Sequence, residues 1–209
     1  MAINSNSTLQ TAVANWLDRD DLTARIPEFI SLCEARFNRT LRIRAMETLD
    51  TSVSTVAGTK TIALPTGYVQ MRDIHLTSDP LIQLQYVTPE IMNRINAGSD
   101  TGRPEVYTII GENIVLGPTP ASVYTTSMLY YKTFDALSDS SPTNWVIINA
   151  PDVYLYGTLL EAEPFLMNDA RVQLWATALT ESINTLQEQD NKDRHSGSAL
   201  RVMNTGGYY

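Results

Sequence analysis

Cysteine and histidine are scarce in this 209-residue chain, which contains one cysteine and two histidines. Cys33 cannot form a disulfide within the chain, and it lies on the apolar stripe of a candidate helix, so we expect a buried and inert thiol. His75 and His195 are far apart in the sequence, and neither belongs to a cluster with the spacing of metal ligands. We therefore expect no metal site and no cofactor.

Motifs that support bond-making chemistry are also missing. The chain has no P-loop, no GxGxxG before a helix, no GxSxG and no CxxC. Glu161 and Glu163 are two positions apart on a predicted helix and so point to different sides, which makes them a poor acid and base pair. We expect no catalytic residues and a protein that is not an enzyme.

Long apolar runs and excess positive charge are lacking too. Runs such as Asn144 to Ala150 are far shorter than the roughly 20 residues of a membrane span, and the N-terminal MAINSNSTLQ shows no signal-peptide pattern. We expect no membrane contact and synthesis in the cytoplasm of the cell that makes the protein. A net charge of −8 repels duplex DNA, so sequence-specific DNA binding is not expected.

Apolar residues recur at helical spacing at both ends of the chain. The pattern predicts one helix from Thr8 to Leu17 and a second that starts between Leu22 and Ile26, with Pro27 in its first turn. A third should start at Pro151 and end near Pro164. The last should start at Asn168-Asp169, with the stripe Val172, Trp175, Leu179, Ile183 and Leu186 packed on other helices.

The middle of the chain, from about Ile43, is rich in Thr, Val, Ile and Tyr and is broken by turn signals, as short antiparallel strands require. Gly102 to Pro120 is predicted to form two strands around a turn at Gly111-Glu112. Val69 to Leu76 should pair with Leu81 to Tyr86. Val123 to Phe134 has large side chains on both faces, which is typical of a central strand.

These patterns predict an α+β fold. We expect N- and C-terminal helices to form a bundle, with an antiparallel β-rich lobe inserted between them and an extended C-terminal tail. The expected boundaries are residues 1–42 and 151–190 for the bundle, 43–150 for the lobe and 191–209 for the tail.

The tail, residues 191–209, has no sustained apolar period. Ordering these residues would cost roughly 20 to 40 kcal/mol, so we expect a partner surface to order it, with an inert frayed end as the alternative. The candidate docking residues are Arg194, Leu200, Arg201, Val202, Met203, Tyr208 and Tyr209.

A basic cluster of four arginines follows the second predicted helix: Arg36, Arg39, Arg42 and Arg44. One interpretation is interaction with the helix C-terminus and pairing with Glu34, Glu47 or Asp50. The other is a contact with a neighbouring subunit or another protein of an assembly.

Three segments together resemble a known family: TIALPTGYVQMRDIHL, GRPEVYTIIGENIVLGPTP and NAPDVYLYGTLLEAEPFLMNDARVQLW. Their order and spacing, between about Leu22 and Leu186, are similar to those of the head-to-tail adaptor (connector) proteins of tailed bacteriophages, especially short-tailed ones.

The resemblance implies a structural virion protein at the head-tail junction. Members of this family form a ring, typically of twelve copies, beneath the portal protein. The ring extends the channel through which genomic DNA passes without sequence-specific binding, and it carries the tail nozzle or other tail proteins. A C-terminal segment commonly reaches the portal, so the resemblance implies portal docking by the tail and portal or inter-subunit contacts for the arginine cluster.

Two alternatives remain open from the sequence. The β-rich middle and the ten tyrosines also fit a carbohydrate-binding or fibre-associated tail module. A hydrolase without a recognisable motif is the other.

Overall fold

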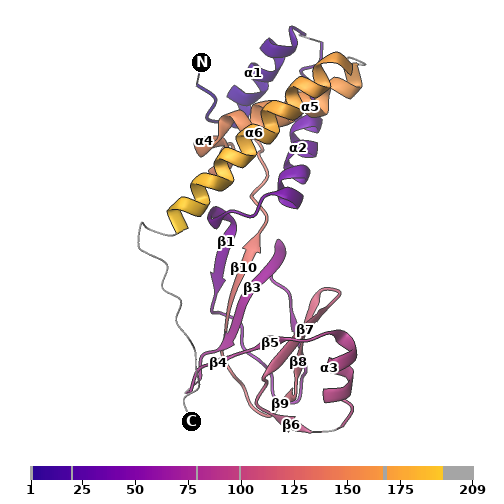
Figure 1. Ribbon diagram of the computed structural model, residues 1–209, viewed down its shortest axis with the longest axis vertical. Coiled ribbons are helices and arrows are strands. Elements are labelled where there is room, and N and C mark those ends of the chain that lie inside the picture. The colour runs from indigo at the N-terminus through magenta and orange to yellow at the C-terminus, as the bar shows by residue number, and fades with distance from the viewer. Residues whose placement is uncertain (1, 20, 79, 99, 167–168, 195–209) are drawn as a thin grey trace. The chain divides into compact units, whose positions relative to one another are not determined.

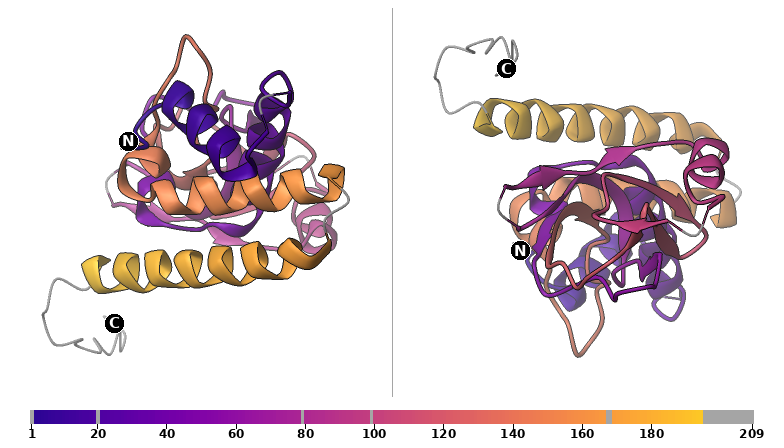
Figure 2. Two further views of the ribbon diagram at one scale, coloured as in Figure 1. Left: turned by 90° about the horizontal axis from the view of Figure 1, so that it is seen from above. Right: turned by 90° about the horizontal axis from the view of Figure 1, so that it is seen from below.

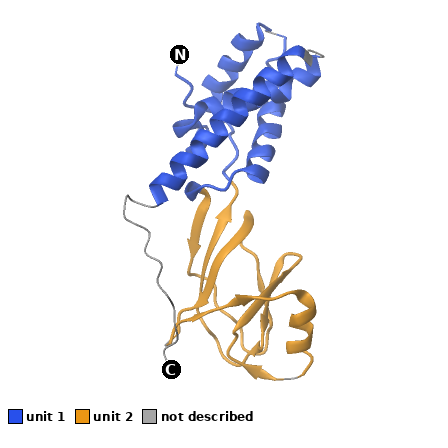
Figure 3. Cartoon of the chain, in the orientation of Figure 1, with its two compact units in different colours: residues 1–45, 134–209 blue, residues 46–133 orange. Residues whose placement is uncertain are grey.

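The computed structural model describes residues 2–19, 21–78, 80–98, 100–166 and 169–194. The chain divides into two compact units, a helical unit formed by residues 1–45 and 134–209 and a β-rich unit formed by residues 46–133 (Figure 3). This confirms the predicted α+β class. The chain returns from the β-rich unit to the helical unit between Thr133 and Phe134, whereas the sequence pattern predicts this boundary at residue 150. Residues 134–150 therefore belong with the helices.

Five helices of the described residues make up the helical unit: α1 (Asn6–Leu17), α2 (Ile26–Thr40), α4 (Trp145–Asn149), α5 (Pro151–Leu166) and α6 (Asp169–Arg194). Helix α5 packs against each of the other four, and seen from above it lies between α1 and α6 (Figure 2). The C-terminal helices thus complete a bundle that the N-terminal helices begin, as predicted.

Local sequence explains where these helices begin and end. The Ser5 side chain accepts a hydrogen bond from the Thr8 amide while the Thr8 side chain accepts one from the Ser5 amide, a reciprocal cap at the start of α1. Asp18 ends α1 in a left-handed conformation, with φ of 52°. Pro27 lies in the first turn of α2, as predicted, where no helical N–H is lost.

Helix α6 carries the predicted apolar stripe. Trp175, Leu179 and Leu186 are buried, and Val172 and Ile183 are partly buried. The helix runs to Arg194, so it includes the first four residues of the expected tail, 191–194. The candidate docking residues from Leu200 to Tyr209 lie outside the described residues.

Helices α2 and α5 approach each other closely at Gly157. A Cβ at this position would lie 2.4 Å from Cys33 Sγ and 3.2 Å from the Phe37 ring, so only glycine permits this spacing. Cys33 is fully buried, as predicted. Burial raises the pKa of its thiol well above the ordinary value, which makes it a poor nucleophile.

The β-rich unit contains two four-stranded sheets (Figure 1). The first has the order β1-β10-β3-β4 and consists of Glu47–Asp50, Thr126–Lys132, Tyr68–Leu76 and Ile82–Gln83. All its pairs are antiparallel, and β10 is a central strand as predicted. The second has the order β2-β8-β7-β5 and consists of Thr61–Ala63, Asn113–Gly117, Val106–Ile110 and Gln85–Tyr86.

The predicted hairpin is formed by β7 and β8, which pair antiparallel around Gly111 with φ of +60°. Strand β5 pairs with β7 in parallel, and so do β6 (Thr101–Gly102) and β9 (Thr119–Pro120). Helix α3 (Pro89–Ile95) packs on β7 and β8. Buried side chains of both sheets form one core: Ile62, Ile74, Leu76, Leu84, Tyr107, Ile114, Leu116, Met128 and Tyr130.

Candidate functional site: the arginine cluster and the α6 groove

The four arginines of the predicted cluster have different environments. Arg36 Nε donates to Glu161 Oε1 at 2.6 Å and joins α2 to α5. An Arg42 nitrogen donates to the Asn38 carbonyl at 3.0 Å, at the C-terminal end of α2. Arg36 and Arg42 therefore stabilise the bundle itself, and Arg42 does so in the way that we predicted for a helix C-terminus.

Arg39 and Arg44 are both exposed. Arg39 lies in the last turn of α2. The Arg44 amide donates to Asp190 Oδ1 at 2.9 Å, and its guanidinium donates to the Asp193 carbonyl at 3.4 Å. The two exposed arginines therefore differ in role. Arg44 fixes the segment after α2 to the C-terminal half of α6, whereas Arg39 projects from the end of α2.

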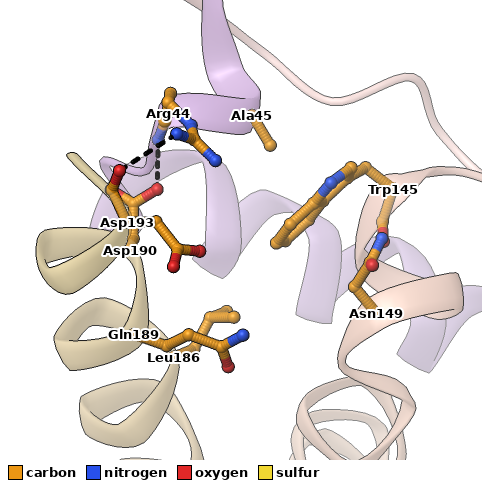
Figure 4. Close-up of a pocket in the computed structure, with 8 residues that line it drawn as sticks. All are labelled: Arg44, Ala45, Trp145, Asn149, Leu186, Gln189, Asp190 and Asp193. Carbon is orange, nitrogen blue, oxygen red and sulfur yellow. Dashed lines mark hydrogen bonds between the residues drawn. The ribbon is translucent and has the colours of Figure 1, made fainter. Parts of the chain in front are cut away.

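A cavity of about 330 Å³ lies beside Arg44 (Figure 4). Trp145 and Asn149 of α4 stand across the opening from Asp190 and Asp193 of α6, while Leu186 and Gln189 line it from α6. Phe134 stacks on Trp145, with ring centroids 6.5 Å apart. The indole therefore has one supported face, and 39% of the Trp145 residue surface remains exposed.

A second cavity of about 410 Å³ continues along α6 and shares Asn149, Leu186 and Gln189 with the first. We call the two cavities together the α6 groove. Its further lining residues are Asp152 and Tyr156 of α5 and Ala178, Glu181, Ser182 and Thr185 of α6. Four carboxylates and one guanidinium line the groove, so it favours a cationic and partly apolar ligand.

A partly buried polar network holds the segment after β10 against the bundle. Glu34 Oε1 accepts hydrogen bonds from the Leu137 amide at 2.8 Å and from the Tyr154 hydroxyl at 3.0 Å. Asn144 donates to Tyr154 at 2.6 Å and caps α4 through the Ile147 amide. Desolvation raises the pKa of Glu34 above its ordinary value, and the hydrogen bonds only partly oppose it.

A second carboxylate, Glu163, is buried inside the helical unit. Its Oε1 accepts a hydrogen bond from Trp175 Nε1 at 2.8 Å, and its Oε2 has no partner among the described residues. Glu161 and Glu163 point to different sides of α5, as their spacing predicts, and have different partners. Glu161 pairs with Arg36 and Glu163 is fully buried, because the guanidinium and the indole that bind them come from other helices.

The described residues offer little for catalysis. His75 Nδ1 lies 3.1 Å from Asp73 Oδ2, and Gln83 donates to the other oxygen of Asp73, so this cluster joins strands β3 and β4. In the parts of the chain that the structure describes, no three His, Cys, Asp or Glu residues are placed to hold a metal ion. No helix among those parts is both long and apolar enough to cross a membrane.

The described residues form an α+β fold with one helical unit and one β-rich unit. The family model for the SU10 adaptor protein matches residues 6–203, which include both units. The chain therefore belongs to the SU10 adaptor protein family, a family of phage head-tail adaptors. This confirms the resemblance seen in the sequence; no curated protein matches the chain. The family is one of structural phage proteins and not of enzymes.

Proposed function

We propose that the protein is the head-to-tail adaptor of a short-tailed phage and forms a ring of twelve copies beneath the portal. In this role it extends the DNA channel and carries the tail nozzle or other tail proteins in the virion. Membership of the adaptor family over both units is the observation that supports the role most directly. The net charge of −8 on each subunit would let DNA move through the ring without adhering to it.

Large apolar side chains on the helical unit support the use of its surface for assembly. Leu32, Ile148, Phe165 and Leu174 each have more than half of their residue surface exposed. The centre of a protein interface contains few charged residues, and large apolar side chains of this kind pack well there. Arg39 lies on α2, the helix that also carries Leu32, and would add a charged contact at the rim.

Weak contacts between neighbours fit assembly on the portal. A portal ring that holds one subunit raises the effective concentration of the next, so contacts that are too weak in solution close a ring on the template. We infer that the free protein is monomeric and that rings form when portal is present. Mixing the two purified proteins and counting subunits by electron microscopy tests this, and an adaptor that leaves the portal bare would contradict the proposal.

Arg39→Glu tests the inter-subunit or portal contact among the arginines. Because Arg39 is exposed in the last turn of α2, reversal of its charge should lower the free energy of unfolding by only about 1 kcal/mol while it lowers the yield of rings on the portal. Arg94→Glu makes the same charge change at an exposed position in the last turn of another helix, α3, and serves as the matched control. Equal ring yields for the two variants would remove Arg39 from the interface.

Arg194 at the end of α6 and the segment that follows it are proposed to dock on the portal, and the residues of that segment are Leu200, Arg201, Val202, Met203, Tyr208 and Tyr209. Ending the chain after Arg194 leaves every described helix and strand intact. This truncated protein should fold as the full chain does and bind the portal more weakly in a pull-down assay. Binding as tight as that of the full chain would rule out the docking role.

A further inference from the structure

The α6 groove is lined mainly by polar side chains and has more carboxylates than cationic groups. Asp152, Glu181, Asp190 and Asp193 line it together with Arg44. Asp190 already pairs with Arg194 at 2.8 Å, so Asp152, Glu181 and Asp193 contribute the carboxylates that are more available to a ligand. Trp145 and Leu186 provide apolar surface beside them.

Residues 195–209 have the complementary composition. The sequence HSGSALRVMNTGGYY contains Arg201 and His195 and no aspartate or glutamate. Leu200, Val202 and Met203 surround Arg201, which gives a short segment with one fixed positive charge and three apolar side chains. Opposite charge and matched apolar surface are the features that select a peptide for a groove of this kind.

The segment also starts where the groove ends. Asp190 and Asp193 line the first cavity, and α6 ends directly after them at Arg194. At a rise of 1.5 Å per residue, the lining residue Ala178 lies about 24 Å back along the helix. An extended chain covers about 3.3 Å per residue, so Arg201 can reach about 23 Å from Arg194, which is enough to lie beside Glu181 at about 20 Å along the helix of the same subunit.

We propose that residues 195–209 bind in the α6 groove of their own subunit, with Arg201 facing the carboxylates of Glu181 and Asp152. The groove of the same chain is favoured over that of a neighbour because the short connection gives a high effective concentration. One consequence rests on the proposed function. If residues 195–209 dock on the portal, the groove competes with the portal for this segment.

The test uses the isolated protein without portal, so its failure would not bear on the adaptor role. Labelling with 5-fluorotryptophan gives a fluorine resonance for each of the three tryptophans, and Trp145→Phe identifies the one in the groove. Ending the chain after Arg194 should shift the Trp145 resonance and speed hydrogen exchange at residues 178–190. Adding a peptide of residues 195–209 to the truncated protein should reverse both changes.

Two charge variants of the full chain check the site. In the full chain, Glu181→Lys should reproduce the spectral and exchange changes caused by truncation. In the truncated protein, the same substitution should raise the Kd of the added peptide at least fivefold. Glu188→Lys makes the same change at an exposed position of α6 that does not line the groove and should leave both measurements as in wild type. No spectral or exchange difference on truncation, or equal effects of the two lysines, would overturn the proposal. So would changes that appear in the full chain only at high protein concentration, because these indicate binding to a neighbour.

Discussion

Replacement of Gly157 by alanine tests the close packing of α2 on α5. The new methyl group would lie 2.4 Å from Cys33 Sγ and within 3.3 Å of the Phe37 ring. Overpacking of a core by one carbon costs about 1 to 3 kcal/mol, while alanine in place of glycine inside a helix returns about 1 kcal/mol. We expect a net loss of between about 0 and 2 kcal/mol in the free energy of unfolding.

Tryptophan fluorescence in a urea titration measures this loss selectively, because Trp16, Trp145 and Trp175 all belong to the helical unit. Cys33→Ala removes the sulfur that the new methyl group meets. The double variant should therefore be more stable than the sum of the two single effects predicts, by about 1 kcal/mol. A more stable Gly157→Ala protein, or strict additivity with Cys33→Ala, would refute the packing described here.

Two further substitutions concern the buried carboxylates. Because the pKa of Glu34 is raised by desolvation, the folded protein binds this proton more tightly than the unfolded chain, and stability from Glu34 is lost as the pH rises through the folded pKa. Glu34→Gln should thus be more favourable relative to wild type at pH 7 than at pH 4 in urea titrations, and a difference independent of pH would contradict this. Trp175→Phe removes the donor to Glu163 and should cost about 1 to 3 kcal/mol beyond lost packing. Thermal unfolding should show a smaller loss for Trp16→Phe, whose residue surface is 48% exposed; equal losses would argue against the hydrogen bond.

Elements defined by local patterns were predictable from the sequence. The β7–β8 hairpin follows from a glycine at the one turn position that needs positive φ, and the stripe of α6 follows from helical spacing. Helix α4 was missed because an apolar run of seven residues fits a strand as well as a buried helix turn. The Ile147 amide donates to Asn144 Oδ1, and this cap favours the helix over the strand. The sequence pattern alone does not identify Asn144 as a cap.

The extra turn at the end of α6 and the parallel strand pairs depend on distant partners. Residues 191–194 lack apolar side chains, yet the helix continues because Asp190 accepts from the Arg44 amide and pairs with Arg194. Strand β5 joins β7 across a stretch that includes α3, and a two-residue strand carries no signal for its partner.

The arginine cluster could be found from the sequence, but the partner and the role of each arginine could not. Arg36 meets Glu161, which is 125 positions away, and no local spacing identifies that partner. The α6 groove was missed for the same reason, since its lining comes from the segment at Arg44, from α4 and α5, and from α6. Sequence thus locates charge, and the packing of distant helices decides which charge is left at the surface.

That remaining charge has a larger effect in a ring than in one subunit. An exposed contact at Arg39 would contribute only about 0.5 kcal/mol to each interface, but a closed ring repeats the same contact at every interface. Mixing wild-type and Arg39→Glu subunits in known ratios on the portal should therefore reduce complete rings more steeply than the variant fraction rises. A ring yield that falls only in proportion to that fraction would mean that the subunits bind the portal independently and that contacts between neighbours do not close the ring.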